Sequence, residues 1–151
     1  MGIRATTSPA QFKKMLQNEV NKHKQLLLRN LLYCAEAITN KAREAGTYTD
    51  RTKNLRSSIG TIVVVDGEII KQYGFEPLAS EAHRGSIEGQ EYAKQLAKEY
   101  PKGYAIIAVA GKEYASYVAD KGYDVLDSAE LLAHQLVPSI LSELKLTQQT
   151  K

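Results

Sequence analysis

The sequence has no tryptophan, one cysteine, two phenylalanines and four prolines among its 151 residues. A single cysteine cannot form a disulfide within the chain, and we expect a reducing compartment. No apolar run reaches the ~18 residues that a membrane-spanning helix needs, so we expect no membrane insertion. The N-terminal residues lack the apolar core of a secretory signal. The length suits one domain covering residues 1–151.

Residues with catalytic or metal-binding chemistry are few and scattered. None of the three histidines, His23, His83 and His134, has a second ligand at a metal-binding spacing. Ser57 has no glycine-flanked context of a nucleophile elbow. Cys34 falls within a helical apolar pattern, where a buried thiol acts as a small hydrophobic residue. We therefore expect no enzymatic activity, no metal and no cofactor.

Charge is distributed unevenly along the chain, although the net charge is only +3. Residues 1–56 hold eleven Lys and Arg against four Asp and Glu, whereas residues 57–151 hold nine against thirteen. A basic part and an acidic part can bring copies together head to tail, or bring the basic part to an acidic partner. The alternative is that the lysines only solvate a long helix. The small net charge makes nucleic acid an unexpected partner.

The first element is predicted to be a helix over residues 9–45, about 55 Å long at 1.5 Å per residue. Residues 8–11 form a capping box with proline at the first helical position. Apolar residues then recur at helical spacing, and Gly46 is expected to end the helix in a left-handed cap. We expect residues 26–32 to be buried and the first, lysine-bearing turns to project.

Strands are predicted over residues 61–65 and 68–73, joined by a two-residue Asp66-Gly67 turn. The most apolar run, residues 103–110, is expected to be a central strand. The predicted fold class is α+β, with the long N-terminal helix packed on a small, mostly antiparallel sheet and a C-terminal helix nearby.

The remaining segments carry weaker signals. Residues 74–87 are predicted to be an exposed loop, and residues 86–100 are predicted to be a helix that Pro101 ends. A C-terminal helix should cover residues 127–145, with Pro138 kinking or restarting it. Residues 147–151 should be a frayed tail. The predicted core residues are Leu27, Leu31, Ile38, Leu55, Ile107 and Val109.

Two segments are candidate interfaces. The first combines cationic residues with a tyrosine and an asparagine; its members are Tyr48, Arg51, Asn54 and Arg56. The second is rich in tyrosine, which is favoured at interfaces; its members are Tyr114, Tyr117, Gly122 and Tyr123. Two interpretations of residues 51–56 remain open: a contact surface, or an internal brace in which Arg56 holds a carboxylate or helix carbonyls.

Both segments resemble motifs of the tail-completion, or head–tail joining, proteins of siphovirus-like tailed phages. The pattern D-x-T-G-x-L-R-x-S-I is matched by Asp50, Thr52, Leu55, Arg56, Ser58 and Ile59. The pattern Y-A-x-Y-V-E-x-G is matched by Tyr114, Ala115, Tyr117 and Val118, with Gly122 slightly displaced. Lys53 replaces the usual glycine, and Ala119-Asp120 stands where a glutamate is usual. Residues 74–100 look like an insertion relative to the family.

The resemblance implies a structural protein of a virion or prophage at the neck or tail top. Such proteins form rings, often of six copies, either alone or only on a template. The implied partners are further copies of the chain, the phage connector and the tail-tube proteins. The implied locations are the virion neck or tail and, during assembly, the cytoplasm of the bacterial host. The alternative is a small nucleic-acid-binding or regulatory domain.

Overall fold

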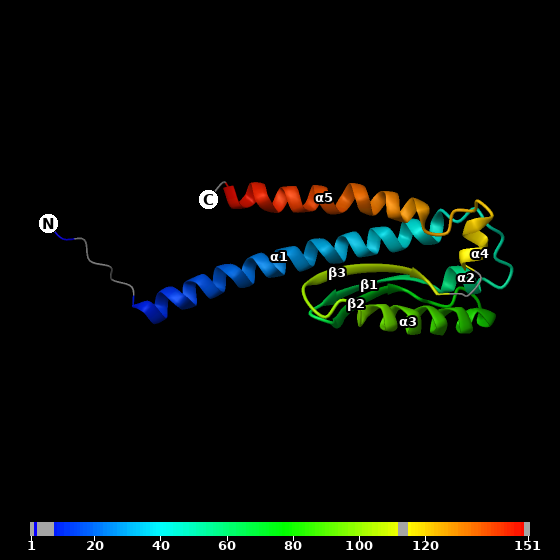
Figure 1. Ribbon diagram of the computed structural model, residues 1–151, viewed down its shortest axis with the longest axis horizontal. Coiled ribbons are helices and arrows are strands. Elements are labelled where there is room, and N and C mark those ends of the chain that lie inside the picture. The colour runs from blue at the N-terminus through cyan, green and yellow to red at the C-terminus, as the bar shows by residue number, and fades with distance from the viewer. Residues whose placement is uncertain (1, 3–7, 112–114, 150–151) are drawn as a thin grey trace.

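A computed structural model describes residues 2, 8–111 and 115–149, without the side chains of 116, 117 and 144–149. Its elements are α1 (Pro9–Glu44), α2 (Asn54–Ser57), β1 (Ile59–Val65), β2 (Glu68–Gly74), a 3-10 turn η1 (Ser80–Ala82), α3 (His83–Ala97), β3 (Tyr104–Ala110), α4 (Ala115–Asp120) and α5 (Asp127–Gln149). The α+β class is confirmed, with the long helix, the small antiparallel sheet and the C-terminal helix (Figure 1).

The capping box at the start of α1 is confirmed. The Gln11 backbone N–H donates to Ser8 Oγ and the Ser8 backbone N–H donates to Gln11 Oε1, both at 3.2 Å. These two bonds satisfy donors that the first helical turn leaves without a partner. Pro9 occupies the first turn, where its missing N–H costs nothing.

The predicted left-handed cap at Gly46 is wrong. α1 ends at Glu44, and its cap residue Ala45 keeps a right-handed conformation, with φ −77° and ψ −7°. Gly46 is needed for a close contact instead: a Cβ there would lie 2.7 Å from the ring of Tyr48. The glycine therefore allows the Tyr48 ring to pack against the chain just after α1.

The sheet has the order β2-β1-β3, and both strand pairs are antiparallel. The Asp66-Gly67 turn is confirmed, with positive φ at both residues as a type I′ turn requires. The prediction that residues 103–110 form the central strand is wrong, because β1 is central and β3 lies at an edge. Both strands are apolar because the layers on either side of the sheet contact both of them.

Helices cover both faces of the sheet (Figure 1). On one face the C-terminal half of α1 packs against β1, where Leu31 and Ala35 contact Val63. On the other face α3 packs through Ala93 and Ala97. The helix α5 packs on α1 and lies further from the sheet.

The segment 74–100 forms the second of these covering layers. The predicted exposed loop over residues 74–87 is wrong from η1 onward, because α3 begins at His83. Glycines at Gly85 and Gly89 bring α3 close to its neighbours: a Cβ on them would lie 2.1 Å from Asn54 O and 2.3 Å from Ser58 O. Because glycine lowers helix propensity, Gly85 favoured a loop in the sequence, whereas the predicted helix over residues 86–100 corresponds to most of α3.

Four predicted core residues are buried: Leu31, Ile38, Leu55 and Val109. Leu27 and Ile107 are only half-buried, because Leu27 lies before the part of α1 that the sheet covers and Ile107 lies on the edge strand. Residues 26–32 were predicted to be buried, but Leu31 is the only one of them that is fully buried.

The helix α5 also differs from its prediction. It runs through Pro138 without a break to Gln149, because packing on α1 holds residues on both sides of the proline. Residues 147–149 are therefore helical rather than frayed, and 150–151 lie outside the described residues.

The close approach of α3 can be tested with Gly89→Ala. Helix propensity alone predicts that alanine stabilises a helix, by about 1 kcal/mol. The new Cβ would clash with Ser58 O and the Phe75 ring, so we expect a net loss of about 1–3 kcal/mol in the free energy of unfolding. Chemical denaturation measures this, with the exposed Glu91→Ala as control. A stabilised Gly89→Ala variant would contradict the packing.

Candidate interface surfaces

Residues 46–56 form an internal brace between the end of α1 and α2. Arg56 Nη2 donates to Gly46 O at 2.8 Å, and its guanidinium lies 5.2 Å from the centre of the Tyr48 ring. The Arg56 backbone N–H donates to Asp50 Oδ2 at 2.8 Å. Tyr48 is buried, with 6% of its surface exposed, and Arg56 is half-buried. These contacts correspond to the brace interpretation of Arg56.

Asn54 connects α2 to the start of α3. Its Oδ1 accepts from the Gly85 backbone N–H at 2.8 Å, and its Nδ2 donates to Glu81 O at 3.2 Å. Arg51, by contrast, is exposed. Of the four candidates in this segment, Arg51 therefore lies on the surface, while the other three make contacts within the fold.

The second candidate segment is only partly described. Tyr114 lies outside the described residues, and the side chain of Tyr117, on α4, does too. Gly122 follows α4 with φ +86°, and its N–H donates to Ala119 O at 2.9 Å. Tyr123 is 46% exposed, so its ring is accessible to a partner.

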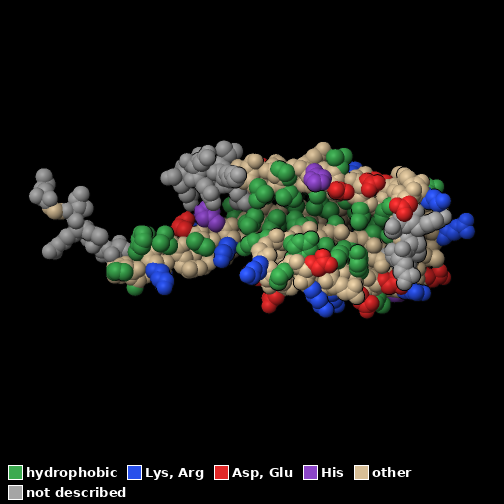
Figure 2. Space-filling model, in the orientation of Figure 1, with side chains coloured by type: hydrophobic (Ala, Val, Ile, Leu, Met, Phe, Trp, Pro, Cys, Tyr) green, Lys and Arg blue, Asp and Glu red, His purple; other side chains and the backbone are tan. Residues whose placement is uncertain are grey.

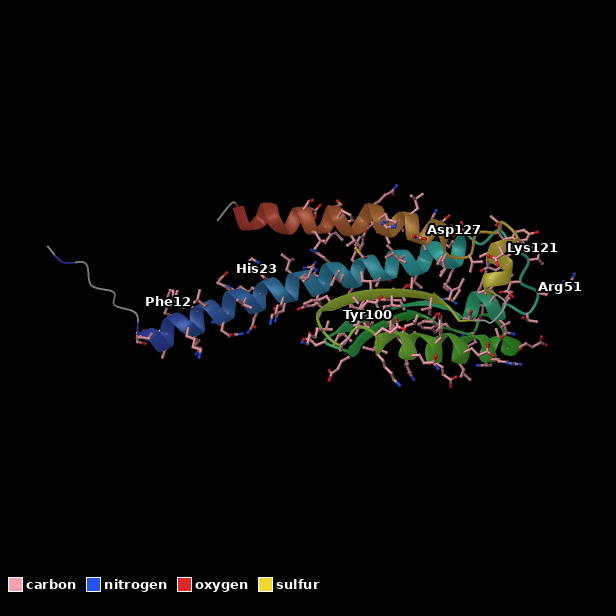
Figure 3. All side chains as sticks on the ribbon, in the orientation of Figure 1. Phe12, His23, Arg51, Tyr100, Lys121 and Asp127 are labelled. Carbon is pink, nitrogen blue, oxygen red and sulfur yellow. The ribbon has the colours of Figure 1, made fainter. Side chains whose placement is uncertain are left out.

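The fold brings the two candidate segments to the same end of the molecule. The Asp124 backbone N–H donates to Thr47 Oγ1 at 2.9 Å, and Val125 belongs to the same buried cluster as Tyr48. Figure 3 shows Arg51 and Lys121 at this end, which we call the α2–α4 end. The sequence predicted both segments but could not show that they lie together.

Burial governs the ionisable groups inside the molecule. Burial raises the pKa of Tyr48, and the Arg56 guanidinium offsets part of that rise. Burial also raises the pKa of the Cys34 thiol, which is fully buried as predicted and is therefore a poor nucleophile.

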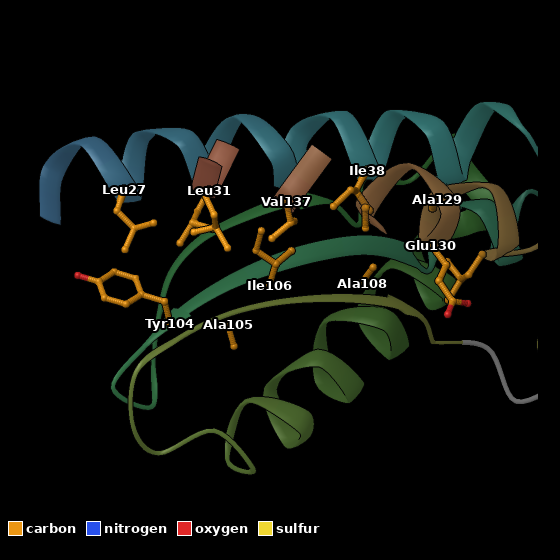
Figure 4. Close-up of a pocket in the computed structure, with 13 residues that line it drawn as sticks. Leu27, Leu31, Ile38, Tyr104, Ala105, Ile106, Ala108, Ala129, Glu130 and Val137 are labelled. Atoms are coloured by element: carbon orange, nitrogen blue, oxygen red, sulfur yellow. The ribbon is translucent and has the colours of Figure 1, made fainter. Parts of the chain in front are cut away.

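An apolar trough along the molecule was not predicted. Its floor is α1, and its walls are β3 on one side and α5 on the other (Figure 4). Its volume is about 570 Å³, and its lining residues are Leu27, Leu31, Ile38, Tyr104, Ala105, Ile106, Ala108, Leu126, Ala129, Glu130, Ala133, Val137 and Leu141. The lining contains several alanines, which leave space between the larger side chains. These alanines can be recognised as the lining of a trough only once the fold is known.

The first turns of α1 project beyond the sheet and α5, as predicted (Figure 1). Every residue from Pro9 to Lys22 is exposed. Four of them form an apolar stripe whose side chains are 45–58% exposed: Phe12, Met15, Leu16 and Val20. Figure 2 shows hydrophobic side chains gathered on this projection and also along the middle of the body.

No protein-family model, curated protein or solved structure matches this chain. Among the described residues, no three acidic, histidine or cysteine side chains lie close enough together to hold a metal ion. No helix within the described ranges is long and apolar enough to cross a membrane.

The brace predicts that Arg56→Ala destabilises the fold. The variant loses a charge-assisted hydrogen bond to Gly46 O and the contact with the Tyr48 ring, which together are worth about 2–3 kcal/mol. Thermal and chemical unfolding measure the loss. Arg51→Ala, on the surface of the same segment, should change stability by less than about 0.5 kcal/mol. Equal effects of the two substitutions would argue against the brace.

Alkaline unfolding provides a second test of the brace. A raised pKa means that folded Tyr48 holds its proton more tightly than unfolded Tyr48. The stability that folded Tyr48 contributes by holding this proton is therefore complete below the unfolded pKa of ~10. It is lost as the pH rises through the folded pKa. Tyr48→Phe should consequently lose less stability than the wild type between about pH 9 and about pH 11. Identical pH profiles for Tyr48→Phe and the wild type would contradict this.

Proposed function

We propose that this chain is a structural component of the neck or tail top of a tailed phage or prophage, where copies of it form a joining or tail-completion ring. Its partners in this role are further copies of itself, the connector and the tail-tube proteins. It works in the virion after assembling in the bacterial cytoplasm. The motifs around Arg56 and Tyr117 support the phage family, and the exposed apolar side chains of α1 support an assembly with partners.

The proposal rests mainly on one observation, the mostly exposed N-terminal part of α1 over residues 9–24, which we call the projecting half of α1. Its apolar stripe is about half exposed in the isolated chain, on a helix segment that no other described element covers. Contiguous exposed apolar side chains mark interaction surfaces, because contact with a partner removes them from water. A chain that carries such a stripe at one end and the α2–α4 end at the other has two separate surfaces for an assembly.

The absence of enzymatic activity and of a cofactor remains a prediction. It rests on the scattered histidines and on the buried Cys34. A joining protein needs no active site, so the prediction agrees with the proposed role without testing it.

A nucleic-acid-binding domain is the second candidate, and one observation favours it. The exposed first turns of α1 carry four lysines, Lys13, Lys14, Lys22 and Lys24, against one acid, Glu19. Lysines on one helix can contact phosphates, and such binding weakens steeply as salt rises. Salt-dependent binding to duplex DNA that is lost in Lys13→Glu would favour this candidate over the structural one.

Deletion of the gene from its phage or prophage tests the proposed function. We expect filled heads and tails that remain unjoined, or tails without a completed top, in electron micrographs of the lysate. The full chain supplied from a plasmid should restore complete particles. Complete infectious particles without the gene would overturn the proposal.

Single substitutions at the α2–α4 end test which surface acts in assembly. Complementation with Arg51→Ala or Tyr123→Ala should lower the yield of complete particles while leaving thermal stability unchanged, because both side chains are exposed. Tyr33→Ala is the matched control, since Tyr33 is an exposed tyrosine on the covered half of α1. Full yields with both end variants would remove this surface from the interface.

A further inference from the structure

We infer that the trough between β3 and α5 binds the projecting half of α1 from a second copy of this chain. The inference specifies a contact for the proposed ring and rests on that proposal for its biological setting. The docking itself follows from the shape, polarity and charge of the two surfaces.

The occupant must come from another copy. The stripe and the trough floor belong to one unbroken helix, since α1 runs from Pro9 to Glu44 and Leu27, Leu31 and Ile38 lie on the floor. A straight helix cannot fold its first turns back onto its own later turns. The stripe of one copy can therefore fill only the trough of another.

The two surfaces match in size and polarity. At 1.5 Å per residue, the stripe from Phe12 to Val20 spans about 12 Å, and the floor from Leu27 to Ile38 spans about 17 Å. The lining of the trough is almost entirely apolar, and small residues such as Ala108 and Ala133 leave room for the larger side chains of a stripe. Docking would form a third helix layer between α5 and the edge of the sheet.

One flank of the stripe is basic, and the α5 wall of the trough is acidic. Lys13 and Lys24 lie on one flank of the stripe, at the 100° angular spacing of helical residues. On the wall opposite β3, α5 carries Asp127, Glu130 and Glu143 between residues 127 and 143, with no lysine or arginine in that range. Among the described lining residues, Glu130 is the only charged one. The docked helix would therefore turn its basic flank toward the acidic α5 wall rather than toward β3, because opposite charges attract.

The contact joins unlike surfaces, so it is heterologous. Each copy would offer a stripe to one neighbour and a trough to the other, which gives a closed ring when the rotation permits and an open filament when it does not. The sheet edge at β3 offers a competing arrangement, in which two copies pair their β3 strands about a two-fold axis.

Cysteine cross-linking of full-length chains tests the docking. A tagged Leu16→Cys chain is mixed at high concentration with an untagged Ala133→Cys chain and oxidised. We expect a mixed dimer several-fold more abundant than in a control mixture of Tyr33→Cys with Ala133→Cys, because Tyr33 is at least as accessible as Leu16 but lies outside the stripe. The wild type should give no cross-link, since Cys34 is fully buried. Salt near 1 M should reduce the yield without abolishing it, because screening weakens only the charged flank.

Two other results of the cross-linking experiment would overturn the docking. Equal yields in the test and control mixtures would show random collision. Efficient self-linking of an Ile107→Cys chain at the centre of β3, without a link between positions 16 and 133, would show strand pairing instead. The cross-linking and the gene deletion test separate claims. A cross-link between positions 16 and 133 together with normal particles after gene deletion would keep the docking and remove the phage role. No such cross-link together with defective particles would keep the phage role and remove the docking.

Discussion

The sheet covers only one part of α1, and this limit decides which residues of the helix are buried. From Leu31 onward, the helix contacts β1 or α5 and buries residues such as Ala35, Ile38 and Ala42. Before that point the same helix continues with an apolar pattern but without described neighbours over its first turns. A helical segment of only a few turns is marginal in water when it has no tertiary packing. One half of α1 thus builds the domain, and the other half remains available for a partner.

This division explains the arrangement at both ends of the molecule. At the C-terminal end of α1, Arg56 and Tyr48 close the gap between α1 and α2, and Thr47 holds the chain after α4. The brace joins α1 to α2 at the α2–α4 end, where Arg51 and Tyr123 are exposed. At the other end the stripe projects from a continuous helix, so its position relative to the body is set by the helix itself.

Local signals were sufficient to predict the fold where short-range chemistry decides the structure. The capping box at Ser8 and the turn at Asp66 involve residues that are close in sequence, and both are confirmed. Strand order was not predictable, because β1 and β3 are both apolar and only tertiary packing decides which lies at the edge. The start of α3 was predicted at residue 86 rather than His83, because Gly85 lowers helix propensity, and the reason for this glycine, its close approach to Asn54, lies elsewhere in the chain. Of the candidate site, the segments were predictable, but the burial of Tyr48 and the existence of the trough were not, since both depend on residues brought together by folding.

Amide hydrogen exchange along α1, measured over a range of protein concentrations, tests the division of this helix most directly. We expect strong protection of residues 31–44 at every concentration. We also expect residues 9–24 to exchange rapidly in dilute protein and to become protected as the concentration rises, together with β3 and α5 around the trough. Protection of residues 9–24 that is independent of concentration, or that rises without any change around the trough, would contradict the claim that a second copy covers this half of the helix.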